Sequence, residues 1–359
     1  MKRIILFIAA CFCVITGIYS ASFLPGNSTH LIEEKYNSWS GVIRIWVSSD
    51  CGAVSLLNAC ASITEKSLNG IYFHIQEVPS SAIINYHTSG INPPDVIIYP
   101  SSISPDTSKL AAITSAYPLR PGITQASYAI PIFLNAKFWI FNTDTMDHLP
   151  GDMYSISSAC SKSDLNTLVA LSTGLRQDTG SSAVLPGIDL GLSGDAAATP
   201  LPGGTTACRF GQNLTITDNA RAVFASGEAD AFIGGISDVI KLSESFGCSA
   251  AVTGEYIYTN NAIMLSIISK NDSRIDACRA YLDIIMGEGQ TMAARAQAFP
   301  AVTGVSAWQG NTILSSIEAS LEGRTWILGA SDSSAAAQLY IEEKLTANEA
   351  MDRIIKETQ

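Results

Sequence analysis

The sequence contains little charge, and what it has is mostly negative. Only 15% of its 359 residues are charged, and the 32 aspartates and glutamates outnumber the 21 lysines and arginines. The formal net charge is −11 at pH 7, and the basic residues are dispersed along the chain. Nucleic acids and anionic lipids are bound through clustered positive charge, so neither is expected as a partner.

The motifs of common catalytic and cofactor sites are also absent. The four histidines, His30, His74, His87 and His148, show no ligand spacing such as HExxH, so surface or strand positions explain them better than metal ligation. There is no GxSxG elbow, no GxGxxG fingerprint and no GxxxxGK[ST] loop. We therefore expect no enzyme, no cofactor and no metal. A secreted hydrolase stays a remote alternative, because paired catalytic carboxylates meet in space without a fixed spacing.

Long apolar runs are missing except at the N-terminus. Lys2 and Arg3 precede an apolar stretch at 4–18, and small residues follow it, which is the order of a secretory signal. The stretch is shorter than the roughly 20 residues of a membrane-spanning helix. We expect 1–22 to be a signal peptide that sends the chain to the periplasm or the extracellular face of the membrane. Lipidation at Cys11 and retention of the signal as an anchor are the alternatives.

Six of the eight cysteines lie outside the predicted signal, an even number in a chain expected to meet an oxidising compartment. Their separations favour disulfides Cys51–Cys60 and Cys248–Cys278. Buried free thiols are the alternative, since Cys278 lies on the apolar face of its predicted helix. No CxxC spacing occurs among the six, so neither a zinc knuckle nor a thioredoxin-type site is indicated. The six are Cys51, Cys60, Cys160, Cys208, Cys248 and Cys278.

Strands and helices alternate in the part of the sequence that follows. Strands are predicted at 42–47, 71–75 and 95–99, with helical spacing of apolar residues behind the first of them. This order is a βαβ pattern and predicts a parallel sheet, whose strand ends would line a ligand crevice. A stretch rich in serine and glycine, 151–215, interrupts the alternation before a strand at 229–235.

Four stretches follow one another in a recognisable order. The first is the strand at 43–46 with a polar break and a helix behind it, and the second is Pro94-Asp95 before a buried strand. The third runs from Asp276 through Gln290 to Phe299-Pro300, and the fourth is the capped terminal helix at 345–351. Together they resemble the extracellular solute-binding proteins of bacterial ABC importers, and most closely the branch that binds sugars and oligosaccharides.

The resemblance implies an α/β fold with two lobes, the type 2 periplasmic-binding-protein fold, and a hinged central cleft. Crossovers near Lys137–Asn142 and Glu255–Thr259 would act as hinges. It also implies that the small-residue helix at 288–298 packs tightly against a neighbouring element. The predicted boundaries are 1–22 signal peptide, 23–41 flexible tether, 42–137 and 259–305 lobe 1, 138–258 lobe 2, and 306–359 C-terminal helices packing across both lobes.

The same resemblance places a ligand at the carboxyl ends of strands. Aromatic rings there would suit the apolar face of a sugar while polar neighbours bind its hydroxyls, whereas serine-rich loops would suit an oxyanion. Core packing is the alternative for each aromatic residue, and above all for Trp139, whose neighbours are apolar. The candidate residues are Ser49, Asp50, Tyr99, Ser101, Tyr128, Trp139, Gly235, Ser237 and Trp308.

The function implied is the capture of a small solute, a sugar or oligosaccharide, by a monomer that closes around it. The partners would be this small-molecule solute and the permease subunits of an ABC importer. A binding protein for an oxyanion, a metal chelate or a polyamine stays open as an alternative. So does a ligand sensor for a membrane receptor, because it would need the same cleft.

Overall fold

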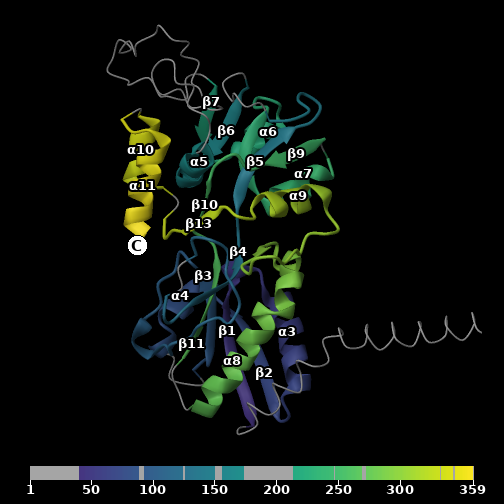
Figure 1. Cartoon of the computed structure of the whole chain (residues 1–359), viewed down its shortest axis with the longest axis vertical. Helices are drawn as coiled ribbons and strands as arrows, with labels where there is room; N and C mark the ends of the chain where they lie inside the picture. Colours follow the sequence, from purple (N-terminus) through teal and green to yellow (C-terminus); the bar gives the residue numbers. More distant parts are fainter. Residues whose placement is uncertain are drawn as a thin grey trace, which may run out of the picture.

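The chain forms two α/β lobes, each built on one mixed β-sheet, as the computed structural model shows (Figure 1). This confirms the predicted two-lobed α/β fold class. The predicted signal peptide, almost all of the predicted tether and most of the serine- and glycine-rich stretch lie outside the described residues. The structure describes residues 40–88, 93–123, 126–149, 156–173, 213–245, 247–268, 272–331, 333–342 and 344–358.

The first lobe contains a six-stranded sheet in the order β12-β4-β11-β3-β1-β2. β1 runs parallel to both β2 and β3, as the βαβ pattern predicts. β11 runs antiparallel to its two neighbours, β3 and β4, although it comes from a much later part of the chain. The strands are β1 (Gly41–Ser48), β2 (Ile71–Val78), β3 (Val96–Pro100), β4 (Ile130–Leu134), β11 (Ile263–Ile267) and β12 (Phe299–Pro300).

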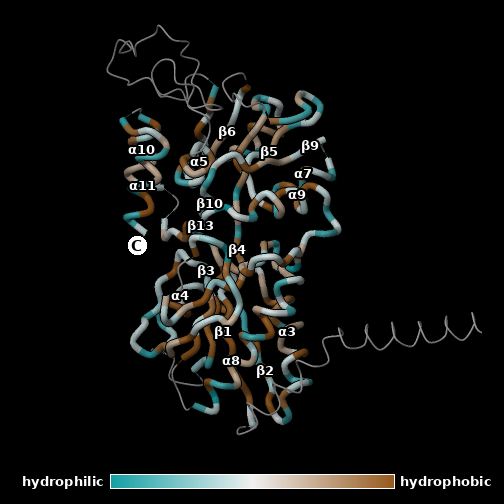
Figure 2. The backbone as a smooth tube through the Cα atoms, viewed as in Figure 1, coloured by the Kyte–Doolittle hydropathy of each residue, from teal (hydrophilic) through white to brown (hydrophobic). Residues whose placement is uncertain are grey.

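Helices α3 and α8 and the 3-10 helix η6 pack together against this sheet and share one apolar core with it. The predicted tight packing of the small-residue segment is confirmed: a Cβ added at Gly289 would lie 3.0 Å from the Cys60 sulfur. Apolar residues concentrate along the strands of this lobe (Figure 2). Its helices are η1 (Ser49–Cys51), α3 (Val54–Ser67), α4 (Ser80–Ile84), η2 (Tyr86–Thr88), η3 (Thr107–Lys109), α8 (Asp272–Met286) and η6 (Glu288–Ala296).

The second lobe contains a five-stranded sheet in the order β7-β6-β8-β5-β9. β5 lies inside this sheet, and its alternate side chains point into two different apolar clusters, so both of its faces are covered. The strands are β5 (Lys137–Asn142), β6 (Ser158–Ser161), β7 (Leu214–Thr217), β8 (Ala231–Gly235) and β9 (Cys248–Ala251). The helices are η5 (Lys162–Asp164), α5 (Leu165–Ser172), α6 (Ala220–Ala225) and α7 (Ile236–Ser243).

The C-terminal helices contact mainly elements of the second lobe. α9 (Thr312–Ser320) contacts α7 and β9, while α10 (Ala335–Ile341) and α11 (Ala347–Thr358) contact α5, all in the second lobe (Figure 1). The apolar face of α11, which the sequence predicts, packs against the second lobe: Ala350, Met351 and Ile354 belong to the apolar cluster that contains Trp139. α10 and α11 therefore complete the core of the second lobe, whereas α9 joins an apolar cluster that also contains Tyr99 and Phe299 of the first lobe.

Within the described ranges, the chain passes between the lobes three times. The first passage is Asn135-Ala136, between β4 and β5, and the second is 260–262, between β10 (Tyr256–Thr259) and β11. The Asn135 side-chain amide donates to the Asn261 carbonyl at 2.9 Å and so joins the two passages. The first passage directly precedes the predicted crossover at Lys137–Asn142, and the second directly follows the predicted crossover at Glu255–Thr259. In the structure, these two predicted crossovers form strands β5 and β10. β10 pairs in parallel with β13 (Thr325–Leu328) in a separate two-stranded sheet.

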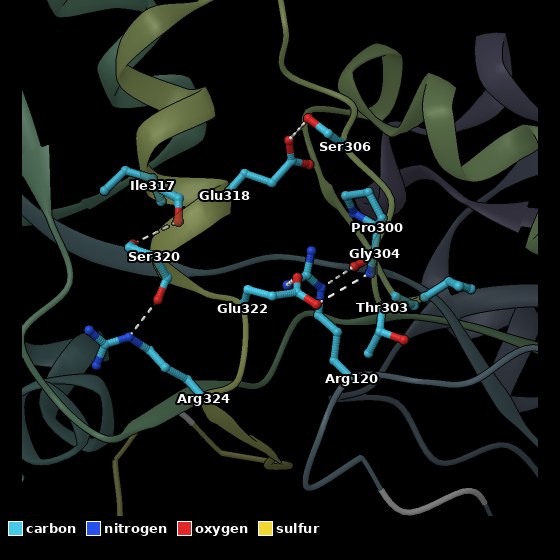
Figure 3. A network of polar contacts seen from close by, with 12 residues as sticks. Arg120, Pro300, Thr303, Gly304, Ser306, Ile317, Glu318, Ser320, Glu322 and Arg324 are labelled. Carbon is cyan, nitrogen blue, oxygen red and sulfur yellow. Dashed lines mark hydrogen bonds and ion pairs between the residues drawn. The ribbon is translucent and has the colours of Figure 1, made fainter.

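The third passage, 301–311, leads from β12 to α9 and was not predicted. The buried guanidinium of Arg120 donates to the Pro300 carbonyl at 2.8 Å and to the Glu322 carboxylate at 3.0 Å (Figure 3). Glu322 also accepts from the Gly304 amide at 3.3 Å. Glu318 of α9 accepts from two backbone amides and a serine hydroxyl of the same passage. Two carboxylates therefore attach this passage to the second lobe.

The five described cysteines are buried free thiols, which corrects the predicted disulfides. Cys248 lies in β9 of the second lobe and Cys278 in α8 of the first, so this pair is wrong. The pair Cys51–Cys60 is also wrong, because Cys51 ends η1 while Cys60 lies inside α3 against η6. The sixth cysteine, Cys208, lies outside the described residues.

We expect these thiols to resist alkylation in the folded protein. Burial raises the pKa of Cys51 and that of Cys60 to about 12, so little reactive thiolate forms near neutral pH. Treatment with iodoacetamide at mildly alkaline pH, followed by peptide mass spectrometry, should label none of the five before unfolding in guanidinium chloride and all of them afterwards. Native-state labelling of Cys51 at the rate of a free cysteine would show that its burial is not as described.

Candidate functional site

A cavity of about 450 Å³ lies between the two lobes. Binding sites for small molecules span roughly 300–1,000 Å³, so its size suits a small solute. Each lobe contributes one wall and the first two passages contribute the floor. The first-lobe wall is 49–52 and 295–297, the second-lobe wall is Lys137, Ser163, Asp164, Thr167 and 235–237, and the floor is 135–136 and 258–261.

The first part of the wall of lobe 1 is the turn that follows β1. The Ser48 hydroxyl accepts from the Asp50 amide at 3.3 Å and so starts η1 directly at the end of the strand. Ser80 and Ser48 donate from their hydroxyls to one oxygen of the Asp50 carboxylate. Gly52 then adopts a φ of +60°, which lets the chain turn into α3. The result is an oriented and exposed carboxylate at the cavity.

The second part of this wall is the end of η6. Arg295 and Gln297 are both exposed there and line the cavity. Neither side chain has a hydrogen bond or an ion pair with another residue in the part of the chain that the structure describes. Their donors, together with the Gln297 carbonyl oxygen, are therefore available to a ligand.

The wall of lobe 2 contains an ion pair and two helix starts. The Lys137 ammonium pairs with the carboxylate of Asp164, whose side chain is only 5% exposed. Asp164 directly precedes α5, and Gly235 directly precedes α7, where the Gly235 amide donates to Asp238 at 3.0 Å. Helix starts carry partial positive charge. This wall therefore presents the partial positive charges of two helix starts to the cavity, whereas the charges of Lys137 and Asp164 neutralise each other.

Four of the predicted site residues are brought together at this cavity. Ser49 and Asp50 lie on the wall of lobe 1, and Gly235 and Ser237 lie on the wall of lobe 2. They lie at the ends of strands in two different sheets: Ser49 and Asp50 follow β1, Gly235 is the last residue of β8, and Ser237 comes two residues later. Their contact with a ligand remains a prediction.

The predicted aromatic site residues lie in the core instead. Tyr99 is 3% exposed, its hydroxyl lies 2.8 Å from that of Ser266, and burial raises its pKa to about 12. Trp139 is fully buried, and Trp308 donates from its indole nitrogen to the Ala298 carbonyl at 3.0 Å. Tyr128 is half-buried against the apolar cluster that contains Tyr99. The strands that carry Tyr99 and Trp139 are covered on both faces, so these rings cannot reach the cavity.

Ser101 also stays outside the cavity lining, where it fixes the second passage between the lobes. Its amide donates to the Ala262 carbonyl at 2.8 Å, and its hydroxyl accepts from the Ala262 amide at 3.2 Å. Within the described lining, Tyr258 is the one aromatic residue; it is 3% exposed, and its hydroxyl donates to the Ser331 carbonyl. The aromatic platform predicted for a sugar is therefore not found there.

Several lining residues were not predicted. The asparagines at 260 and 261 stand between two apolar strands, β10 and β11, and this abrupt polar break is a signal that could have located them. Asn135 breaks the apolar sequence between β4 and β5 in the same way. Arg295 and Gln297 carried no such signal, because only the packing of η6 shows which of its residues reach the cavity.

The lining suits the binding of a polar solute. It combines two carboxylates, two cationic side chains, amides and hydroxyls. In the described ranges, no group of three or more His, Cys, Asp or Glu side chains could hold a metal ion. In the same ranges, no helix is long and apolar enough to cross a membrane.

Solved structures of binding proteins share this fold. The cyclic α-maltosyl-1,6-maltose binding protein from Arthrobacter globiformis matches 89% of this chain and 99% of its own, with a TM-score of 0.59 and 13% identity. The maltose-binding periplasmic protein from Listeria monocytogenes, in complex with maltose, matches 88% of this chain and 97% of its own, with a TM-score of 0.58 and 14% identity.

A family 1 extracellular solute-binding protein from Bifidobacterium longum subsp. infantis is similar in the same way. It matches 88% of this chain and 98% of its own, with a TM-score of 0.56 and 15% identity. No protein-family model matches the sequence, and no curated protein matches it. At such identities the likeness is one of fold, and it confirms the two-lobed periplasmic-binding-protein fold that the sequence predicts.

Proposed function

We propose that the protein is an exported solute-binding protein that captures a small polar solute in the cavity between its lobes. The observation that carries the proposal is the cavity itself, lined with polar groups from both lobes and from the passages between them. The similar proteins named above support a sugar or oligosaccharide as the solute, since two of them are described by the maltose compounds that they bind. Delivery to the permease subunits of an ABC importer completes the proposed role.

The mechanism is closure without a chemical step. A solute that touches both walls gains all its contacts only when the lobes are shut, so it shifts the equilibrium towards the closed form by its differential affinity. Asn135-Ala136 and 260–262 are short, both contribute residues to the cavity lining, and one hydrogen bond joins them, which suits them to bend together. The third passage is held by Glu318 and Glu322 and would act as the fixed side of the movement.

A second candidate is an oxyanion-binding protein. It is favoured by the exposed guanidinium of Arg295, which has no hydrogen bond or ion pair in the described part of the chain. The starts of α5 and α7 at the opposite wall would add partial positive charge.

A thermal-shift panel of neutral sugars, oxyanions, polyamines and ferric chelates, combined with small-angle scattering, tests the proposal. A solute present at a hundred times its dissociation constant stabilises the folded state by about 2.7 kcal/mol, which is readily visible. The same solute should reduce the radius of gyration. If no compound in the panel raises the melting temperature and scattering never changes, the proposed function is wrong.

We expect Asp50→Ala to weaken binding of the sugar found in this panel about tenfold or more, equivalent to about 1.4 kcal/mol. Asp50 is exposed, so the melting temperature of the solute-free variant should stay close to that of the wild type. Calorimetric titration measures the affinity. Asp352→Ala, which changes an exposed carboxylate on α11 away from the cavity, is the matched control. Equal affinities of the Asp50 variant and the wild type would exclude Asp50 from the site.

A further inference from the structure

Gln297 is the one non-glycine residue with a left-handed backbone in the ranges that the structure describes. Its φ is +49° and its ψ is +45°. Seven other described residues have a positive φ, and all of them are glycines. Among these, Gly52 follows η1 and Gly227 lies two residues after α6, so at the ends of two other helices the left-handed residue is a glycine.

The backbone at this point needs the left-handed conformation but not the glutamine side chain. The Gln297 amide donates to the Ala294 carbonyl at 3.0 Å, and the next amide donates to the Ala293 carbonyl at 3.2 Å. These bonds end η6 and turn the chain into β12. A side chain in this conformation costs an L-residue about 1–2 kcal/mol, which a glycine would avoid.

Nothing that the structure describes explains why this position is a glutamine and not a glycine. The Gln297 side chain is exposed, lines the cavity, and has no hydrogen bond to any described residue. Non-glycine residues held in such conformations cluster at binding and active sites, where the strain positions a functional group. The amide is therefore available to a molecule in the cavity.

We infer that Gln297 contacts the ligand and that this ligand carries hydroxyl groups. The inference rests on the proposed solute-binding function and decides between its two candidates. A carboxamide both donates and accepts hydrogen bonds, as a hydroxyl does, whereas a fully deprotonated oxyanion such as sulfate only accepts and an ammonium only donates. On the same wall, the Asp50 carboxylate accepts and the Arg295 guanidinium donates. This wall therefore offers a hydrogen-bond donor, an acceptor and a group that does both, which matches a solute with several hydroxyl groups.

The test compares the wild type with Gln297→Gly in the presence of glucose, maltose, maltotetraose, phosphate, sulfate and spermidine. Without solute, the variant should melt at a higher temperature, because the left-handed residue is now a glycine. Its affinity for the sugar that stabilises the wild type should fall tenfold or more in calorimetric titration. Gln338→Ala, an exposed glutamine on α10, is the matched control and should bind as the wild type does.

Each contrary outcome overturns a definite part of this inference. If Gln297→Gly binds the sugar as tightly as the wild type, Gln297 does not contact the ligand, while the proposed function stands. If only phosphate or sulfate stabilises the wild type, the hydroxyl-bearing class is wrong. If the solute-free glycine variant melts below the wild type, the strain argument fails. If none of the six compounds stabilises the wild type or changes its scattering, the inference fails, and the proposed function falls with it when the full panel of solutes also has no effect.

Discussion

Replacing Trp139 with alanine should lower the free energy of unfolding by about 3–5 kcal/mol. Trp139 is fully buried in β5, and its indole packs in the cluster formed with α5, α10 and α11. The indole nitrogen has no hydrogen-bond partner among the described residues, so the loss is one of apolar packing. Urea denaturation followed by circular dichroism measures it. The folded fraction should keep the affinity of the wild type for its solute.

The control for this variant is Tyr72→Ala, because Tyr72 is an aromatic residue that is 61% exposed on β2. Its stability should change by no more than about 0.5 kcal/mol. If Trp139→Ala unfolds at the same urea concentration as the wild type but no longer binds the solute, Trp139 contacts the ligand and is not a core residue.

The second large effect is expected for Gln290→Leu, which should cost on the order of 4 kcal/mol or more of stability. The fully buried side-chain amide of Gln290 donates to the carbonyls of Ile132 and Ile285, at 2.8 and 3.0 Å. Its carbonyl oxygen accepts from the amides of Ala301 and Val302, at 2.7 and 3.2 Å. Leucine fits the space approximately but leaves four buried backbone groups without these bonds, each at about 1–3 kcal/mol.

Hydrogen exchange distinguishes this mechanism from a general loss of packing. In the Gln290→Leu variant, the amides of Ala301 and Val302 should exchange faster than those at the centre of β1. Gln338→Leu, on the exposed side of α10, is the control and should unfold at nearly the same denaturant concentration as the wild type. A loss below about 1 kcal/mol for Gln290→Leu would mean that water or rearranged backbone replaces the amide.

The parts of the fold that depend on local signals could be predicted from the sequence. The capping box that begins α11 forms as expected, since the Thr346 amide donates to Glu349 at 2.8 Å and the Glu349 amide to Thr346 at 3.2 Å. The parallel strands β1 to β3 follow from the alternation of strand and helix. The position of β11 between β3 and β4 could not be predicted, because strand neighbours from distant parts of a chain leave no periodic signal.

The same distinction, between features with a local sequence signal and features without one, applies to the candidate site. Ser49, Asp50, Gly235 and Ser237 were located by the rule that ligands lie at the carboxyl ends of strands, and they line the cavity. The prediction that Tyr99 lies in the site was wrong, because the sequence of an apolar strand does not reveal which of its two faces is covered by other elements. Both faces of β3 are covered. The disulfide predictions failed for a related reason, since chain separation says nothing about which lobe each cysteine occupies.

The insertion of β11 between β3 and β4 has a consequence for the order in which the protein folds. During synthesis from the N-terminus, β3 and β4 emerge well before β11, so the edges that will face it have no partner. All five strands of the second sheet, from β5 to β9, are complete before β11 exists. The sheet that begins first in the sequence is therefore finished last. Until then, its unpaired edges are open to pairing with another copy of the nascent chain.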